Sequence, residues 1–541
     1  ELQSMESNEG RADIFVNSFI NGTNWEDEVT AIDRMAKLTK EDIVAFADKY
    51  LKEDNYAVVY KKQGKDPNEK KMTKPEITPI VSNRDVASPF LTSIQENAVK
   101  PIEPVFLDFK KDMSQLTAKS DIPVLYKQNT TNDLFQLIYV FDMGNNNDKA
   151  LGTAFDYLEY LGTSDMTPEE LKSEFYRLAC TFYVSPGNER TYVVLSGLNE
   201  NMPAAMQLFE KLLADAQVNK EAYDNLVGDI LKARADAKLN QGQNFSRLMN
   251  YAMYGPKSPA TNLLTEAELA SMNPQELVDR IHNQNNYKHR ILYYGPSSSK
   301  DLLATIDQYH QVPATLKDIP AGNEFSYLET PATKVLVAPY EAKQIYMAQI
   351  SNLDKKYDPA IEPTRELYNE YFGGGMNTIV FQEMREARGL AYSAWANLAI
   401  PTNAKGDYYY MAFIATQNDK MQKAIEAFDE IINNMPESEK AFDIAKEALI
   451  SRLRTERTVK DGVLWSYIRM RDLGLTEPRG KQIFEKAQQM TLADVKAAQE
   501  KWVKGRKYVY GILGDIQDLD LNYLKTLGPI QTVTQEEIFG Y

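Results

Sequence analysis

Residues 371–393 read YFGGGMNTIVFQEMREARGLAYS, and this stretch says more about the fold than any other part of the sequence. Its three successive glycines, residues 373–375, stand between two apolar segments. A phosphate-binding loop would need a GKS/T ending or G-x-G-x-x-G spacing after a strand, and the stretch has neither. We therefore expect the glycines to end one helix and to turn the chain into the next.

The surroundings of this stretch occur twice in the chain. Segments of one part match segments of another at nearly constant separations of 211 to 219 positions. The matching pairs are 157–162 with 368–373, 209–213 with 428–432, and 222–224 with 441–443. Such agreement is hard to obtain by chance, so the sequence predicts a duplicated module. We place one copy at residues 101–321 and the other at residues 322–541.

The end of the module occurs a third time, near the N-terminus. Each occurrence shows a helix start, with Thr or Asn as cap and an acidic residue three positions later, followed by a strand-like segment. The segments are 38–43 with 56–60, 272–277 with 290–295, and 490–495 with 508–514. Residues 1–62 thus resemble only the last part of a module, which is too short to bury a core. We expect the rest of it in a missing N-terminal part or in another chain.

Residues 63–100 separate this remnant from the first complete copy. They are rich in proline and in charged residues. Prolines at this density interrupt helices and sheets, so we predict a semi-rigid linker without regular structure.

Strand-like and helical segments do not alternate regularly within a copy. Apolar residues predict buried strands at 135–141, 192–195, 345–350 and 408–415. Apolar residues at helical spacing predict a long helix around residues 425–432. This order is typical of the α+β class, with an antiparallel sheet and helices packed on one face.

The opening stretch resembles the M16 (pitrilysin/insulinase-like) zinc metallopeptidases. Members show Gly-Gly-Gly-Met/Leu-x-Ser/Thr-x-Leu/Val-Phe and then Arg-Glu-x-x-Gly-Leu-Ala-Tyr, which residues 373–392 follow closely. The resemblance implies LuxS/metallohydrolase-like modules, four of them in single-chain members, forming two halves that enclose a chamber for peptides. The sequence then corresponds to a C-terminal half: the tail of module 2 (1–62), a linker (63–100), an inactive module 3 (101–321) and module 4 (322–541).

Active members hold zinc with an H-x-x-E-H motif and a distal glutamate in their first module. The three histidines of this chain do not form the motif, and we expect packing or surface roles for His282 and His289. Counting back from the Gly-Thr pair at residues 162–163 places Thr153, Asp156 and Tyr157 at the motif's positions, and the distal position falls near Asp229. The resemblance therefore implies no metal ligand and no cofactor in this chain, with Zn²⁺ in the full enzyme.

Two residues of the last module are expected to act on substrate. In two-half members an Arg and a Tyr seven positions apart reach into the active site of the first module, and here they match Arg385 and Tyr392. The resemblance implies that the Arg binds peptide carbonyl groups and that the Tyr hydroxyl donates to the oxyanion formed during hydrolysis. The alternative is a helix-capping or pairing role for Arg385 and core packing for Tyr392. We expect Arg388, Glu383 and Glu386 to form a solvated helix face.

Composition limits the partners further. A formal net charge of −16 argues against nucleic acid and anionic membranes, and no apolar run is long enough to span a bilayer. The lone Cys180 excludes an internal disulfide. The N-terminal residues show no signal peptide, but bacterial members of the family are often exported, so we expect a periplasmic location.

Two functions from different classes remain open at this point. The chain is either the substrate-binding half of a peptide-degrading zinc peptidase, whose zinc lies on an N-terminal half or a catalytic partner chain, or a non-catalytic M16-like scaffold. The truncated first module favours the peptidase half.

Overall fold

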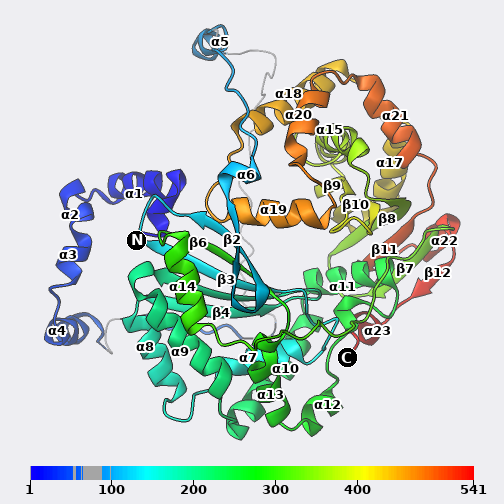
Figure 1. Cartoon of the computed structure of the whole chain (residues 1–541). Helices are drawn as coiled ribbons and strands as arrows, with labels where there is room; N and C mark the ends of the chain where they lie inside the picture. The colour runs from blue at the N-terminus through cyan, green and yellow to red at the C-terminus, as the bar shows by residue number, and fades with distance from the viewer. Residues whose placement is uncertain (1, 53–55, 63, 65–87, 98) are drawn as a thin grey trace. The chain divides into compact units, whose positions relative to one another are not determined.

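The computed structural model describes residues 2–52, 56–62, 64, 88–97 and 99–541 (Figure 1). The chain divides into two compact units, Glu1–Pro101 and Ile102–Tyr541. Most of the predicted linker lies outside the described residues. No helix in the described part of the chain has the length and apolar character needed to cross a membrane.

The first unit consists of short helices. They are α1 (Asn8–Asn21), α2 (Trp25–Val29), α3 (Ala31–Met35), α4 (Lys40–Tyr50) and α5 (Pro89–Gln95). The predicted helix start at residue 39 is confirmed, because Thr39 and Asp42 form a reciprocal capping box. Two expectations are wrong. Residues 56–60 form no strand, since no neighbouring strand pairs with them, and α5 begins inside the linker, where Ser88 caps a helix with Pro89 in its first turn.

The first copy of the module contains a six-stranded sheet. Its strands are β1 (Ser114–Ala118), β2 (Ile122–Gln128), β3 (Leu134–Phe141), β4 (Cys180–Pro186), β5 (Thr191–Leu198) and β6 (Arg290–Gly295). They lie in the order β1-β2-β6-β3-β5-β4. The second sheet has the order β12-β7-β11-β8-β10-β9 and repeats the first in five strands. Its strands are β7 (Lys334–Pro339), β8 (Gln344–Lys356), β9 (Ala391–Ala399), β10 (Asp407–Gln417), β11 (Val509–Gly514) and β12 (Ile530–Thr532). Its sixth strand, β12, comes from the end of the copy and runs parallel to β7, whereas β1 comes from the start and runs antiparallel to β2.

The sheets are mixed, which corrects the expectation of a fully antiparallel arrangement. In each copy a strand from the later part of the chain runs parallel to one from the earlier part, β6 beside β2 and β11 beside β7. A parallel return needs a long connection, and here it contains three further strands of the same sheet as well as helices.

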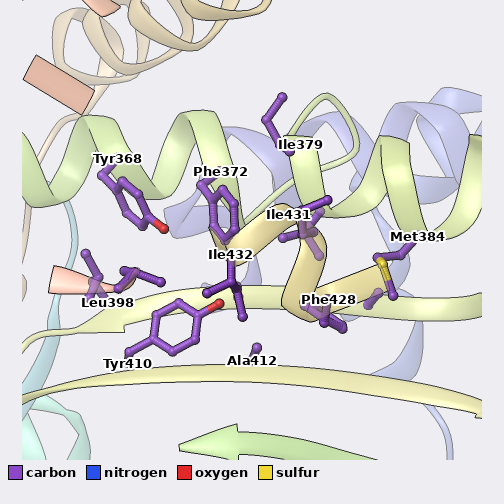
Figure 2. Packing of buried hydrophobic residues seen from close by; sticks show 14 of the residues in the cluster. Tyr368, Phe372, Ile379, Met384, Leu398, Tyr410, Ala412, Phe428, Ile431 and Ile432 are labelled. Carbon is purple, nitrogen blue, oxygen red and sulfur yellow. The ribbon is translucent and has the colours of Figure 1, made fainter. Parts of the chain in front are cut away.

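One face of each sheet is covered by helices of the same copy. In the first copy these are α7 (Leu151–Leu158), α8 (Pro168–Arg177), α9 (Met202–Asp215), α10 (Lys220–Lys238), α12 (Glu266–Ser271), α13 (Gln275–Asn283) and α14 (Ser299–Tyr309). In the second they are α15 (Glu362–Phe372), α16 (Ile379–Phe381), α17 (Met421–Asn433), α18 (Glu439–Thr455), α20 (Arg479–Ala487), α21 (Leu492–Trp502) and α22 (Leu521–Leu527). Figure 2 shows this core in the second copy, where Tyr368 and Phe372 of α15 and Phe428 of α17 pack over Tyr410 of the sheet.

The second face of each sheet is covered by a helix from the other copy, whereas we expected helices on one face only. Helix α11 (Gln241–Tyr254) belongs to the first copy and packs Leu248 and Met249 on β8 and β11 of the second sheet, together with α23 (Gln535–Phe539) (Figure 1). Helix α19 (Gly462–Asp472) belongs to the second copy and packs Leu464 on the first sheet, beside α6 (Phe109–Asp112).

An ion pair joins the two copies next to α19. The guanidinium of Arg190 donates to both carboxylate oxygens of Asp472, at 2.6 and 2.7 Å, and to Asp142 at 2.7 Å. Arg290 donates twice more to Asp142. Although burial alone raises the pKa of Asp142, the hydrogen bonds from Arg290 and Arg190 lower it overall. These charged hydrogen bonds hold the end of α19 against the first sheet.

Each copy also places an acidic side chain at the same position of the repeat, beneath its central strands. Glu210 of α9 is 1% exposed and accepts hydrogen bonds from Tyr139 of β3, Asn285 and the backbone of Gln311. Asp429 of α17 occupies the same position of the repeat and accepts from Gln349 and Tyr510. Burial raises the pKa of Asp429.

Two histidines extend the network in the first copy. Nδ1 of His310 lies 2.6 Å from Glu210, and Nε2 of His310 lies 2.8 Å from Nε2 of His289. Since Nδ1 of His289 faces the carbonyl oxygen of Tyr287 at 2.7 Å, it must donate, so Nε2 of His289 accepts from His310. Burial, and after it the neighbouring His310, lower the pKa of His289 to about 3. The packing role predicted for His289 is therefore observed.

We expect Leu248→Ala to lower the free energy of unfolding by ~2–5 kcal/mol, because Leu248 is 0% exposed between α11 and the second sheet. Urea unfolding, followed by circular dichroism, measures the change. Leu239→Ala is the matched control, since Leu239 is 78% exposed, and it should change stability by less than ~0.5 kcal/mol. Equal effects of the two substitutions would show that α11 does not stabilise the second sheet.

The lowered pKa of His289 predicts a pH-dependent stability. In the unfolded chain His289 binds a proton below its ordinary pKa of 6.5, but in the folded chain it does so only below about pH 3. The free energy of unfolding therefore decreases as the pH falls through this range. We expect a contribution of about 1.4 kcal/mol per pH unit, and His289→Gln should remove it. Urea unfolding at several pH values tests this. Above about pH 7.5 the two proteins should show the same pH slope; an unchanged slope in acid would contradict the prediction.

Candidate functional site

Arg385 and Tyr392 lie on either side of a sharp turn at the edge of the second sheet. Arg385 belongs to a π-helical segment, Gln382–Ala387, that continues α16, and Tyr392 is the second residue of the edge strand β9. Gly389 makes the turn with φ of +57°, a conformation that glycine adopts without strain. The buried side chains of Met384 and Leu390 hold both sides of the turn in the core.

The structure brings the two predicted residues together. The guanidinium carbon of Arg385 lies 4.5 Å from the centre of the Tyr392 ring and 4.9 Å from that of Phe381. Nη1 of Arg385 also lies 3.4 Å from the carbonyl oxygen of Tyr392. Tyr392 is 78% exposed and does not pack in the core, so the core-packing alternative is excluded for this residue. The pair presents a cation and a phenol at the surface.

The π-helical segment has a consequence for the direction of Arg385. One extra residue per turn rotates the side chains that follow it relative to an α-helix, and such segments are frequent at functional sites.

Near Arg385, Arg388 pairs with Glu383 and with Glu430, and the Glu430 carboxylate lies 2.7 Å from Nη1 of Arg388. The hydrogen bond from Arg388 lowers the pKa of Glu430. Arg388 and Glu386 are exposed and Glu383 is half-buried, as a solvated face would have them.

The positions that correspond to the zinc motif do not fit a metal. The hydroxyl of Tyr157 in α7 donates to the carbonyl oxygen of Asn219 at 2.6 Å and accepts from its N–H at 2.8 Å. Desolvation and the neighbouring Glu159 raise the pKa of Asp156. Asp229 lies exposed on α10. Across the described residues, no group of three or more His, Cys, Asp and Glu side chains is placed to hold a metal ion.

Sequence reasoning missed the buried network around Glu210. A signal was present, because the matching segments 209–213 and 428–432 both place an acid at their second position, between core residues. A buried acid repeated in both copies needs hydrogen-bond donors from the sheet. His310 carried no such signal, since only the fold brings it within 2.6 Å of Glu210.

Comparison with known proteins agrees with the resemblance. The family described as "Peptidase M16 inactive domain" matches residues 291–449. An uncharacterized zinc protease of Rickettsia felis is 21% identical over 325 residues, covering 57% of this chain and 74% of that protein. An uncharacterized zinc protease of Streptomyces coelicolor is 23% identical over 267 residues, covering 46% of this chain and 56% of that protein.

Solved structures share the fold. A peptidase M16 inactive domain from Pseudomonas fluorescens superposes with a TM-score of 0.59 at 18% identity, over 74% of this chain and 98% of that one. The periplasmic protease PqqL from Escherichia coli gives 0.59 at 15% identity, over 90% of this chain and 52% of that one. The ferredoxin protease FusC, in complex with Arabidopsis ferredoxin, gives 0.59 at 11% identity, over 94% of this chain and 58% of that one.

These matches confirm the predicted α+β fold and the predicted relationship. The chain spans about three quarters of the Rickettsia protein but little more than half of the Streptomyces protein, of PqqL and of FusC. Residues 291–449 therefore match the peptidase M16 inactive domain, and the chain resembles zinc proteases in sequence and M16 structures in fold.

Proposed function

We propose that this chain is the C-terminal half of an M16 zinc endopeptidase, with modules at 101–321 and 322–541, and that it binds peptides with Arg385 and Tyr392. Zinc would be held by an N-terminal half or by a partner chain, because the described residues of this chain offer no group of side chains that fits it. The observation that carries the proposal is the contact between the half-buried Arg385 and the exposed Tyr392 at the edge of the second sheet.

Arg385 and Tyr392 can both donate hydrogen bonds to a peptide carbonyl group that becomes negatively charged during hydrolysis. The guanidinium of Arg385 offers several N–H donors in one plane, which match carbonyl oxygens of an extended peptide. The Tyr392 hydroxyl donates a single hydrogen bond and is accessible at the strand edge. Donors aimed at a developing oxyanion lower the barrier to hydrolysis, since they bind the transition state more tightly than the substrate.

The first unit supports the presence of a second half. Ile43 of α4 is 58% exposed, but its counterparts in the repeat, Leu277 of α13 and Val495 of α21, are both 0% exposed. Phe46 and Tyr50 on the same helix are 60% and 50% exposed. An apolar helix face of this kind needs a sheet to cover it. We infer that the remainder of module 2 covers it, either in the same polypeptide or in a partner.

The location of the complete protein is part of the proposal. PqqL, which shares this fold, is described as a periplasmic protease. We propose the periplasm for this chain as well, in keeping with a role in peptide degradation.

Tyr392→Phe should reduce kcat about 10²-fold in the complete peptidase, because one oxyanion donor is lost, with little change in KM. Arg385→Ala should also lower kcat/KM, and Arg385→Lys should restore part of it. The assay mixes this chain with a zinc-bearing M16 half and follows cleavage of a fluorogenic peptide.

Tyr183→Phe serves as the control, since Tyr183 is 51% exposed on β4 of the other copy and should retain full activity. Full activity of both site variants would show that their assigned roles are wrong. An active complex in which this chain itself holds stoichiometric zinc would overturn the divided-site proposal. A stable complex without activity would support the scaffold function.

Phe46→Asp should weaken association with the zinc-bearing half at least tenfold, because it places a charge in the apolar face of α4. Ala45→Asp adds the same charge to the polar side of the helix, beside Asp42 and Asp48, and should have little effect. Sedimentation or calorimetry measures both affinities. Equal affinities would mean that α4 does not contact the other half.

A further inference from the structure

A cavity of about 310 Å³ lies within the second unit, between the segment 105–109 and helices α18, α19 and α20. Its volume is at the lower end of the range for small-molecule sites. Much of its wall is apolar, formed by residues such as Phe106, Leu453, Met470 and Ile483. Phe106 closes over it by packing on Phe484 of α20, with ring centres 5.9 Å apart.

A charged network borders one side of the cavity. Its carboxylates belong to Glu362, Glu366 and Glu370 of α15. Its guanidinium groups are those of Arg365, Arg452 and Arg479. Each arginine approaches at least one of these carboxylates within 3.0 Å, so three negative charges face three positive charges. The network is therefore balanced and leaves no carboxylate for a further cation.

Arg469 of α19 also lines the cavity, together with Arg452 and Arg479 of the charged network. It donates to the carbonyl oxygens of Thr402 at 2.6 Å and Pro401 at 3.0 Å, and it forms no ion pair among the residues that the structure describes. The nearby Asp472 is held by both nitrogens of Arg190. Desolvation and the neighbouring Arg479 lower the pKa of Arg469, which indicates a positive charge without full compensation.

We propose that this cavity binds a small organic anion, a single carboxylate on an apolar body. The carboxylate pairs with Arg469, and the apolar body lies against Met470, Leu453 and Phe106. A partly desolvated guanidinium without a carboxylate partner gains more from an anion than an exposed one. Glu456, which also lines the cavity, is exposed, and its charge is screened by solvent.

Two sources can supply this chemistry: the C-terminal carboxylate of a peptide that ends in an apolar residue, and a free aliphatic acid. N-acetyl-L-leucine represents the first and hexanoate the second. Each has a matched neutral compound, N-acetyl-L-leucinamide and hexanamide. The comparison within each pair isolates the charge, and the comparison between pairs identifies the source.

Isothermal titration calorimetry of the full chain tests the proposal. We expect at least one acid to bind and its amide to bind at least ten times more weakly. Arg469→Gln should remove this difference, whereas Arg469→Lys should keep part of it. Ser466→Phe, which fills the cavity without changing its charge, should abolish binding of the acid. Arg457→Gln is the matched control, because Arg457 also donates to backbone carbonyl groups but does not line the cavity.

The outcomes are distinct. Binding of N-acetyl-L-leucine alone identifies a peptide C-terminus, and binding of hexanoate alone identifies an aliphatic acid. Equal affinities of acid and amide, no binding of either acid, or full binding by folded Arg469→Gln or Ser466→Phe would overturn the proposal. Thermal unfolding establishes that each variant is folded. None of these results depends on peptidase activity.

Discussion

The structure of the second unit depends on one constraint: each of its sheets is apolar on both faces and must be covered twice. Helices of the same copy cover the first face, and a helix that belongs to the other copy covers the second. Leu248 of α11 and Leu464 of α19 are both 0% exposed in these reciprocal contacts. Neither copy could expose its second face to water without a large loss of hydrophobic stabilisation, so the two copies form one body.

Close packing makes this exchange specific. The methyl group of Met249 of α11 lies directly over Gly511 of β11, where a Cβ atom would make it move. On the other side, Asp472 at the end of α19 is held by two hydrogen bonds from Arg190. The edge strand β9 is thereby attached to a rigid scaffold, and a rigid scaffold is what positions an exposed pair such as Arg385 and Tyr392.

The two copies share the same arrangement of strands and helices but differ in their buried and half-buried polar residues. Both place an acid at the same position of the repeat. Glu210 is hydrogen-bonded to Tyr139, Asn285 and His310, whereas Asp429 accepts from Gln349 and Tyr510. In the first copy, Tyr157 stands at a position that matches the zinc motif of the family that the sequence resembles. Its hydroxyl donates to the carbonyl oxygen of Asn219, so a hydrogen bond that stabilises the fold occupies this position.

By itself, the sequence determined the repeated module, the capped helix at Thr39, the main strands and the spacing of Arg385 and Tyr392, because these follow from local periodicity, caps and near neighbours in the chain. Only the tertiary structure decided the parallel return strands, the exchange of α11 and α19, and the meeting of Glu210 with His310, 100 residues away. These contacts join segments remote in sequence, and their energy comes from burial and hydrogen bonding that exist only once the sheets have formed.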